Sequence, residues 1–116
     1  MKRERPAPKT GPVEAPPEED EQYKEKAYSF NPVQSQKDMN VGDQYLKRGS
    51  YRAAAARYVE ATKWNDGNSA AWLRLGEVSE KTKDKQRAMD AYAKYLKLEP
   101  DAKNAAEIRK RIEKLK

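Results

Sequence analysis

Apolar residues between about residues 36 and 115 recur at the three- and four-residue spacing of amphipathic helices, and not in the alternation that is typical of strands. Short polar breaks at residues 48–50 and 82–84 separate some of these apolar stretches. The pattern predicts five helices, over residues 36–48, 51–64, 70–82, 85–98 and 102–115. The expected fold class is therefore all-α.

Polar residues that suit a helix N-cap precede the predicted helices. The candidates for the last four helices are Ser50, Ser69, Asp84 and Asp101. The first helix has two candidate starts. One is Asn31, with Pro32 in the first helical position and Gln34 following it. The other is Ser35, with Asp38 three residues later, and the sequence does not choose between them.

The chain matches itself at one fixed offset, which is the separation of Gly42 from Gly76 and which we call the repeat period. The matching pairs are Val41-Gly42 with Leu75-Gly76, Lys47 with Lys81, Ala54 with Ala88, Tyr58 with Tyr92, and Lys63 with Lys97. A fixed period of this length indicates a repeat architecture. We assign residues 31–34 as a lead-in, 35–68 and 69–102 as two helical hairpins, and 103–116 as a helix that covers the exposed end of the stack.

The repeated pattern resembles the tetratricopeptide repeat family. The first copy matches the family at Val41, Gly42, Tyr45, Ala54, Tyr58 and Ala61, and departs from it at Asp38 and Asp66. The second copy matches at Trp72, Leu75, Gly76, Ala88, Tyr92 and Pro100, and departs at Ser79 and Tyr95. This resemblance implies a right-handed superhelix of two helix-turn-helix repeats with a capping helix.

The same positions have a packing explanation, because small residues let two helices approach closely while large ones fill the space beside them. The predicted repeat core is Gly42, Tyr45, Ala54, Tyr58, Trp72, Leu75, Gly76, Ala88 and Tyr92. Tyr95 stands where the family usually has alanine, so its bulk is expected to widen the gap before the last helix.

The family resemblance also implies a function, since the first helix of each hairpin lines a concave groove that binds peptides. Carried over by position, the groove residues are Gln36, Met39, Asn40, Asp43, Leu46, Lys47, Ala70, Leu73, Arg74, Glu77, Glu80 and Lys81. An apolar floor of Met39, Leu46 and Leu73 with polar residues around it suits a peptide with an acidic or amide-rich flank. The alternative is that these residues form an ordinary solvated face.

One subgroup of the family clamps the C-terminal carboxylate of chaperones with lysine and asparagine in its first hairpin. This chain has Met39 and Asp43 at those positions, so the resemblance does not extend to that activity.

Residues 1–30 have the composition of a disordered tail, with most of the prolines and the acidic run Glu18-Glu19-Asp20-Glu21. Tyr23, Tyr28 and Phe30 are unusual in a spacer. They either lie over the first helix or occupy a binding groove, in this chain or in another protein.

The localisation is left open by the sequence. Residues 1–9 are charged and contain proline, without a signal-peptide core, and no apolar run is long enough to span a membrane. Cytoplasmic residence is the default expectation. The tail also resembles linkers that follow removed export leaders in bacterial envelope proteins with these repeats, so an envelope assembly factor is the alternative.

Candidate catalytic chemistry is sparse. The chain has no cysteine and no histidine, which removes the usual thiolate and imidazole nucleophiles, bases and metal ligands. We therefore expect no enzymatic activity, no metal site and no cofactor.

The basic residues suggest a second candidate surface. The net charge is +6, and residues 1–34 carry six Lys/Arg against seven Asp/Glu, whereas the rest of the chain carries nineteen against twelve. Arg109, Lys110 and Arg111 form a basic cluster that would attract phosphates, acidic tails or anionic lipids, or would simply solubilise the cap.

A protein or peptide is the expected partner, and nucleic acid is not. The sequence therefore favours an adaptor or scaffold, with self-association into a homo-oligomer or binding to an anionic surface as alternatives.

Overall fold

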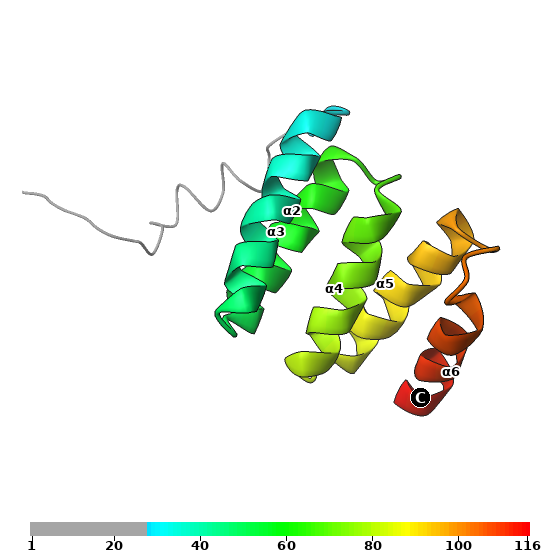
Figure 1. Cartoon of the computed structure of the whole chain (residues 1–116). Coiled ribbons are helices and arrows are strands. Elements are labelled where there is room, and N and C mark those ends of the chain that lie inside the picture. The colour runs from blue at the N-terminus through cyan, green and yellow to red at the C-terminus, as the bar shows by residue number, and fades with distance from the viewer. Residues whose placement is uncertain (1–27) are drawn as a thin grey trace, which may run out of the picture.

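The structure is a computed structural model that describes residues 28–116. These residues form five helices without strands: α2 (Pro32–Lys47), α3 (Tyr51–Trp64), α4 (Ser69–Lys81), α5 (Lys85–Leu98) and α6 (Ala105–Leu115). Successive helices pack side by side as two antiparallel hairpins followed by α6 (Figure 1). The predicted all-α class is confirmed. Most of the predicted disordered tail, including Tyr23, lies outside the described residues.

Helix α2 begins at the earlier of its two candidate starts. The side-chain oxygen of Asn31 accepts a hydrogen bond from the Gln34 amide at 3.0 Å, and Pro32 occupies the first helical turn. Ser35 is fully buried instead of capping, and its hydroxyl donates to the Ala61 carbonyl at 2.8 Å. Residues 31–34 are therefore the N-cap and first turn of α2, and not the separate lead-in that the sequence suggested.

The predicted cap of α4 is displaced by one residue. Asn68, and not Ser69, caps α4: its side-chain oxygen accepts from the Ala71 amide at 3.2 Å while its amide nitrogen donates to Ser35 at 3.0 Å. This second bond ties the first hairpin to the second, which explains why asparagine serves here. Asp84 caps α5 as predicted, accepting from the Arg87 amide at 3.1 Å.

Helix α6 begins at Ala105, three residues later than predicted. Residues 101–104 are not helical, and the residue at the N-cap position is Asn104, not Asp101. The Asn104 side-chain oxygen accepts from the Tyr95 hydroxyl at 2.8 Å, so it is used to join α5 to α6 instead of capping a helix.

Each hairpin is closed by a tyrosine ring that lies directly against a helical glycine. A Cβ atom placed on Gly42 would lie 2.6 Å from a ring carbon of Tyr58, and one on Gly76 would overlap the ring of Tyr92 in the same way. Both tyrosines are fully buried. Because no other residue type leaves this space, the glycines fix how closely the two helices approach.

The two hairpin turns repeat the same backbone geometry. Gly49 has φ 77°, and Lys83, one repeat period further along the chain, has φ 66°. In the residues that follow, the Ser50 amide donates to the Tyr45 carbonyl at 2.9 Å and the Asp84 amide donates to the Ser79 carbonyl at 2.9 Å. These bonds satisfy helix-terminal carbonyls in the manner of a Schellman motif.

The bulk of Tyr95 is accommodated inside the interface between α5 and α6. Its side chain is 8% exposed and belongs to a core cluster with Ala88, Tyr92 and Ile108. A larger cluster, which includes Met39, Tyr58 and Leu75, fills the space between α2, α3 and α4.

The contact between a helical glycine and a tyrosine ring does not recur on α6. One repeat period after Gly76, the chain has Lys110, which is exposed. A lysine there does not leave the space for a tyrosine ring that Gly42 and Gly76 leave.

Gly42→Ala should lower the free energy of unfolding by about 1–2 kcal/mol. Overpacking against a buried ring typically costs about 1–3 kcal/mol, and the higher helix propensity of alanine offsets up to about 1 kcal/mol. Urea unfolding followed by circular dichroism measures the change.

Gly67→Ala is the matched control, because its added Cβ would meet only Asn65 at an ordinary 3.4 Å. It should change stability by less than about 0.5 kcal/mol. A Gly42→Ala variant as stable as the parent would contradict the packing described here.

Candidate functional site

Side chains of α2, α4 and α6 meet on one face of the stack. Asp43, Glu77 and Arg111 are separated by one repeat period each, so they occupy the same position on these three helices. We call the face that they share the concave face, because stacked helical repeats typically form a concave surface on the face that equivalent helices share. Helices α3 and α5 pack behind it and contribute the hydroxyl groups of Tyr58 and Tyr92.

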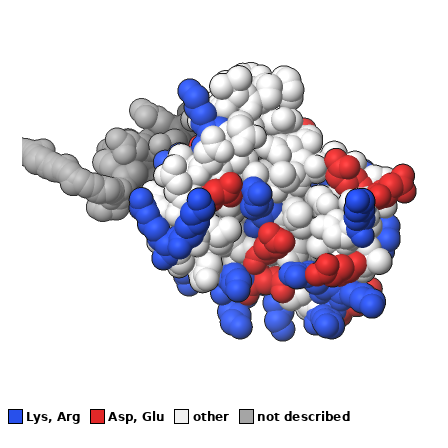
Figure 2. All heavy atoms as spheres, viewed as in Figure 1, with Lys and Arg blue, Asp and Glu red and all other residues white. Residues whose placement is uncertain are grey.

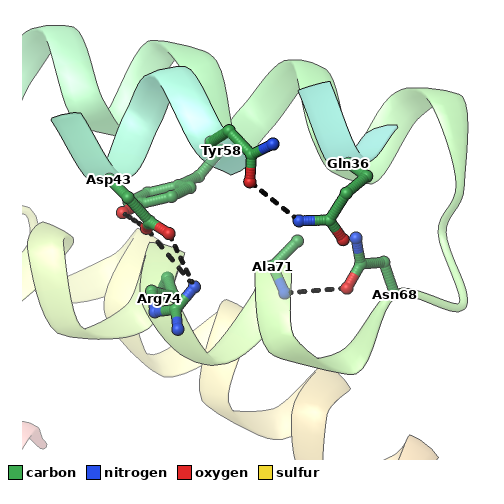
Figure 3. A network of polar contacts seen from close by, with 7 residues as sticks. Gln36, Asp43, Tyr58, Asn68, Ala71 and Arg74 are labelled. Carbon is green, nitrogen blue, oxygen red and sulfur yellow. Dashed lines mark hydrogen bonds and ion pairs between the residues drawn. The ribbon is translucent and has the colours of Figure 1, made fainter. Parts of the chain in front are cut away.

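On α2, the Asp43 carboxylate is held from two sides. It accepts a hydrogen bond from the Tyr58 hydroxyl at 2.6 Å, and Arg74 of α4 donates to it at 3.3 Å. Figure 3 shows the side chains of Tyr58 and Arg74 both pointing toward Asp43. This contact links both hairpins through one carboxylate.

A similar arrangement joins α4 to α6. Glu80 accepts a hydrogen bond from the Tyr92 hydroxyl and forms an ion pair with Arg111 at 3.3 Å. Arg111 also pairs with Glu107 at 3.1 Å. In both cases a buried tyrosine, on α3 or α5, orients an acidic side chain on α2 or α4. That acidic side chain then binds an arginine on the following helix of the concave face, α4 or α6.

A pocket of about 670 Å³ opens beside these contacts, near the C-terminal ends of α2 and α4. Its lining is part apolar and part charged, and consists of Leu46, Tyr51, Glu77, Val78, Glu80, Lys81, Lys83 and Arg111. We call this the groove pocket. Leu46, Glu77, Glu80 and Lys81 are among the residues that the sequence placed in the groove.

Burial and the neighbouring carboxylates shift the acid–base behaviour of the tyrosines. Burial, and then the hydrogen bond to Asp43, raises the pKa of Tyr58 well above its usual 10.0. Burial and the hydrogen bond to Glu80 raise the pKa of Tyr92 in the same direction. Both hydroxyls therefore stay protonated, and remain donors, throughout the physiological range.

Glu77 differs from the other acids of the concave face. Desolvation by the surrounding protein raises its pKa above the usual 4.5, although the side chain is still reached by solvent, and the positive charges of Arg111 and Arg74 oppose this shift. Within residues 28–116 it accepts no hydrogen bond and forms no ion pair.

Other predicted groove residues lie in different environments. Asn40 is exposed and accepts from the Gln36 side chain at 3.0 Å. Lys47 and Lys81 are also exposed, and the Lys81 ammonium lies 5.9 Å from the centre of the Tyr51 ring. Leu73 is half-buried and packs toward α6.

The apolar floor predicted from the sequence needs a correction. Met39 is only 3% exposed and belongs to the core between α2, α3 and α4, so it is not available to a ligand. Leu46, with Tyr51 and Val78, provides the apolar surface of the groove pocket instead.

The predicted repeat core lies inside the stack. Five of its members are buried hydrophobic residues: Ala54, Tyr58, Leu75, Ala88 and Tyr92. Gly42 and Gly76 are buried as well, and Tyr45 and Trp72 are partly buried against the core. The Trp72 indole nitrogen donates to the Asp66 carbonyl at 2.8 Å, which anchors the turn between the hairpins.

The sequence suggested that the basic residues of α6 form a single patch. In the structure they do not. Arg111 turns toward Glu80 and Glu107 on the concave face, whereas Arg109 and Lys110 are exposed elsewhere on the helix. The helical phase could have revealed this, since Arg111 follows Glu77 by one repeat period. Over the face seen in Figure 2, positive and negative side chains are interspersed.

Tyr28 and Phe30 are the two predicted tail aromatics that the structure describes. Tyr28 packs edge-on against Trp64 with ring centres 4.8 Å apart, and its hydroxyl donates to Glu60 at 2.9 Å. Both of these partners belong to α3, whereas the sequence had offered the first helix or a binding groove as the site of Tyr28. Phe30 is 75% exposed.

Two negative findings apply to residues 28–116. None of the five helices is long and apolar enough to cross a membrane. In the same range, no three acidic side chains are grouped in a way that could hold a metal ion.

A family model described as tetratricopeptide repeat matches residues 42–105, more than half of the chain. The chain belongs to the tetratricopeptide repeat family. No curated protein matches its sequence. Tetratricopeptide repeats are generally protein–protein interaction modules and are typically non-catalytic, and their stacked repeats create extended concave surfaces.

Solved tetratricopeptide repeat structures share this fold. The tetratricopeptide repeat domain of Arabidopsis OM64 is 25% identical, with a TM-score of 0.64 over 72% of this chain and 69% of that domain. A tetratricopeptide repeat domain protein from Salinibacter ruber is 18% identical, with a TM-score of 0.62 over 74% of this chain and 90% of that one. The second likeness concerns the fold alone.

Alkaline pH should unfold the protein through the two buried tyrosines. Their pKa values are raised in the folded state, so the stability that they contribute is complete below the unfolded value of 10.0 and is lost as the pH rises beyond it. Each tyrosine should contribute a slope of up to about 1.4 kcal/mol per pH unit above that value.

Urea unfolding between pH 9 and 11.5 tests this on the parent and on the double variant Tyr58→Phe/Tyr92→Phe. The variant should be less stable at neutral pH but should lose stability less steeply with rising pH. Parallel curves for the two proteins would show that the hydroxyls are not held as described.

Proposed function

We propose that this chain is an adaptor that binds a peptide or an extended protein segment across the concave face of α2, α4 and α6. The observation that carries this proposal is the ordering of the polar side chains on that face by Tyr58 and Tyr92, which are themselves held in the core. Side chains that are fixed before binding lose little conformational entropy when a partner arrives.

The groove pocket supports the same function. It places the apolar side chains of Leu46, Tyr51 and Val78 next to charged ones, which is the combination that peptide recognition uses: apolar contacts for affinity and polar contacts for register. Asn40, Lys47 and Lys81, which are exposed along α2 and α4, are proposed to extend the contact surface.

Residues 35–68 and 69–102 are proposed to act as the two repeat units of this module, with residues 103–116 as its cap. Helix α6 has two roles in this proposal. It covers the core cluster around Tyr92 and Tyr95, and it contributes Arg111 to the concave face.

Site-specific photo-crosslinking tests the location of binding. A photoreactive amino acid replaces Lys81 on α4 in one full-length protein and Lys97 on α5 in another; both lysines are exposed. In extracts of the organism that encodes the chain, we expect a discrete crosslinked partner from position 81, because that position borders the groove pocket.

Position 97 is the matched control, because it lies on α5, which packs behind the concave face. Equal yields of one partner from positions 81 and 97, or adducts from position 97 alone, would contradict binding in the concave face. Failure of both positions to capture a partner would count against the adaptor function itself.

A further inference from the structure

The two hairpin turns lie at one end of the stack and gather basic side chains there. Their exposed cations are Lys47, Arg48 and Arg52 at the first turn and Lys81, Lys83 and Lys85 at the second. A pocket of about 490 Å³ joins the two turns and is lined by residues 49–53, Lys81 and Thr82. We call this end the turn surface. Lys and Arg side chains predominate along the lower edge of Figure 2, where Figure 1 places the turns.

The positive charge of the turn surface is not balanced by acids of the fold. Residues 47–53 contain no acid. The acid of the second turn, Asp84, caps α5 and already pairs with Arg87 at 3.5 Å. Within residues 28–116, none of the exposed cations of the turn surface forms an ion pair. Including Glu77 and Glu80 of the groove pocket leaves cations in excess, because Glu80 is bound by Arg111.

Helix stability does not explain the cations at the start of α3 and α5. Arg52 lies in the first turn of α3, Lys85 is the first residue of α5, and neither first turn contains an acid. The N-terminus of a helix carries a partial positive charge, so cations placed there lower the stability of the helix. Lys47 and Lys81, in the last turns of α2 and α4, are placed favourably. The turn surface therefore carries more positive charge than the fold requires, which indicates an anionic ligand.

The chain itself contains a segment of complementary charge. Residues 10–23 have no Lys or Arg and include the acidic run at residues 18–21. The acidic run lies outside the described residues, which begin at Tyr28. Tyr28 is held on α3: its hydroxyl donates to Glu60 at 2.9 Å, and its ring packs against Trp64 with centres 4.8 Å apart. The acidic run is thus tethered to the end of α3 that lies opposite the turns.

The tether is long enough to reach the turn surface. Helix α2 has 16 residues, and at about 1.5 Å per residue its length is about 24 Å. In an extended chain, the residues from Glu21 to Tyr28 span up to about 25 Å, and those from Glu18 to Tyr28 span up to about 35 Å. The acidic run can therefore follow the first hairpin to its turn and place carboxylates beside Arg48 and Arg52.

We propose that the acidic run binds the turn surface of its own chain. Single exposed ion pairs are weak, but consecutive acids form several at once, and the tether gives the run a roughly millimolar effective concentration. This segment is favoured over an external anion because it accompanies every turn surface at that concentration. The inference does not depend on groove binding, although the bound run would border the groove pocket, since Lys81 lines both pockets.

Paramagnetic relaxation enhancement tests this contact in the full chain. The chain has no cysteine, so Gln22→Cys provides a unique site for a nitroxide label directly after the acidic run. At low salt, the backbone amide signals of residues 48–52 and 81–85 should lose intensity relative to the protein with the reduced, diamagnetic label. The loss should diminish at about 1 M salt, where the Debye length is about 3 Å.

The matched control carries the same label and tether without the acids. It combines Glu18→Gln, Glu19→Gln, Asp20→Asn and Glu21→Gln with Gln22→Cys, and should show no intensity loss at the turns beyond that at about 1 M salt.

A second pair of variants tests the turn surface itself. Arg52→Gln/Lys85→Gln should reduce the intensity loss, whereas Lys97→Gln, at an exposed lysine of α5, should not. The fold should tolerate the double change, since it removes cations from the first turns of two helices.

Three results would overturn the proposal. The first is equal intensity loss in the labelled parent and in its acid-free control, and the second is a loss confined to another surface. The third comes from a mixture of spin-labelled protein with unlabelled, isotope-enriched protein, in which only contacts between copies broaden the observed signals. An undiminished loss at the turns in that mixture would assign the acidic run to a second copy.

Discussion

The contact between a tyrosine ring and a helical glycine sets the geometry on which the rest of this structure depends. Tyr58 against Gly42, and Tyr92 against Gly76, fix the distance between the two helices of each hairpin. The same tyrosines extend their hydroxyls to acids on the concave face. Packing and surface order are therefore coupled, because a change that moves the ring also moves the group that orients the carboxylate.

Helix α6 continues the repeat pattern of the first two hairpins on the concave face, but not at the position where a glycine would contact a tyrosine ring. On the concave face, α6 supplies Arg111 at the position that Asp43 occupies on α2 and Glu77 on α4. At the position where Gly42 and Gly76 contact a tyrosine ring, α6 has Lys110 instead of glycine. Helix α6 thus extends the concave face without repeating the contact between glycine and tyrosine.

The sequence predicted the number and order of the helices, because a fixed repeat period and amphipathic spacing depend on residues that are close in the chain. It misplaced the caps of α4 and α6, since Asn68 and Asn104 are selected by bonds to Ser35 and Tyr95 from other helices. The repeat period predicts that Arg111 lies on the same face as Glu77. Treating Arg109, Lys110 and Arg111 as one basic cluster obscured this prediction. Which groove charges stay unsatisfied depends on tertiary pairing, which spacing alone does not reveal.

The central claim is that one repeat phase brings α2, α4 and α6 to a common face, and the carboxyl titration of Glu77 by nuclear magnetic resonance tests it most directly. The account predicts a pKa above the usual 4.5, which rises further in Arg111→Gln because Arg111 lowers it, and which stays unchanged in Lys110→Gln. An ordinary pKa for Glu77, or equal effects of the two substitutions, would contradict the arrangement of α6 against α4.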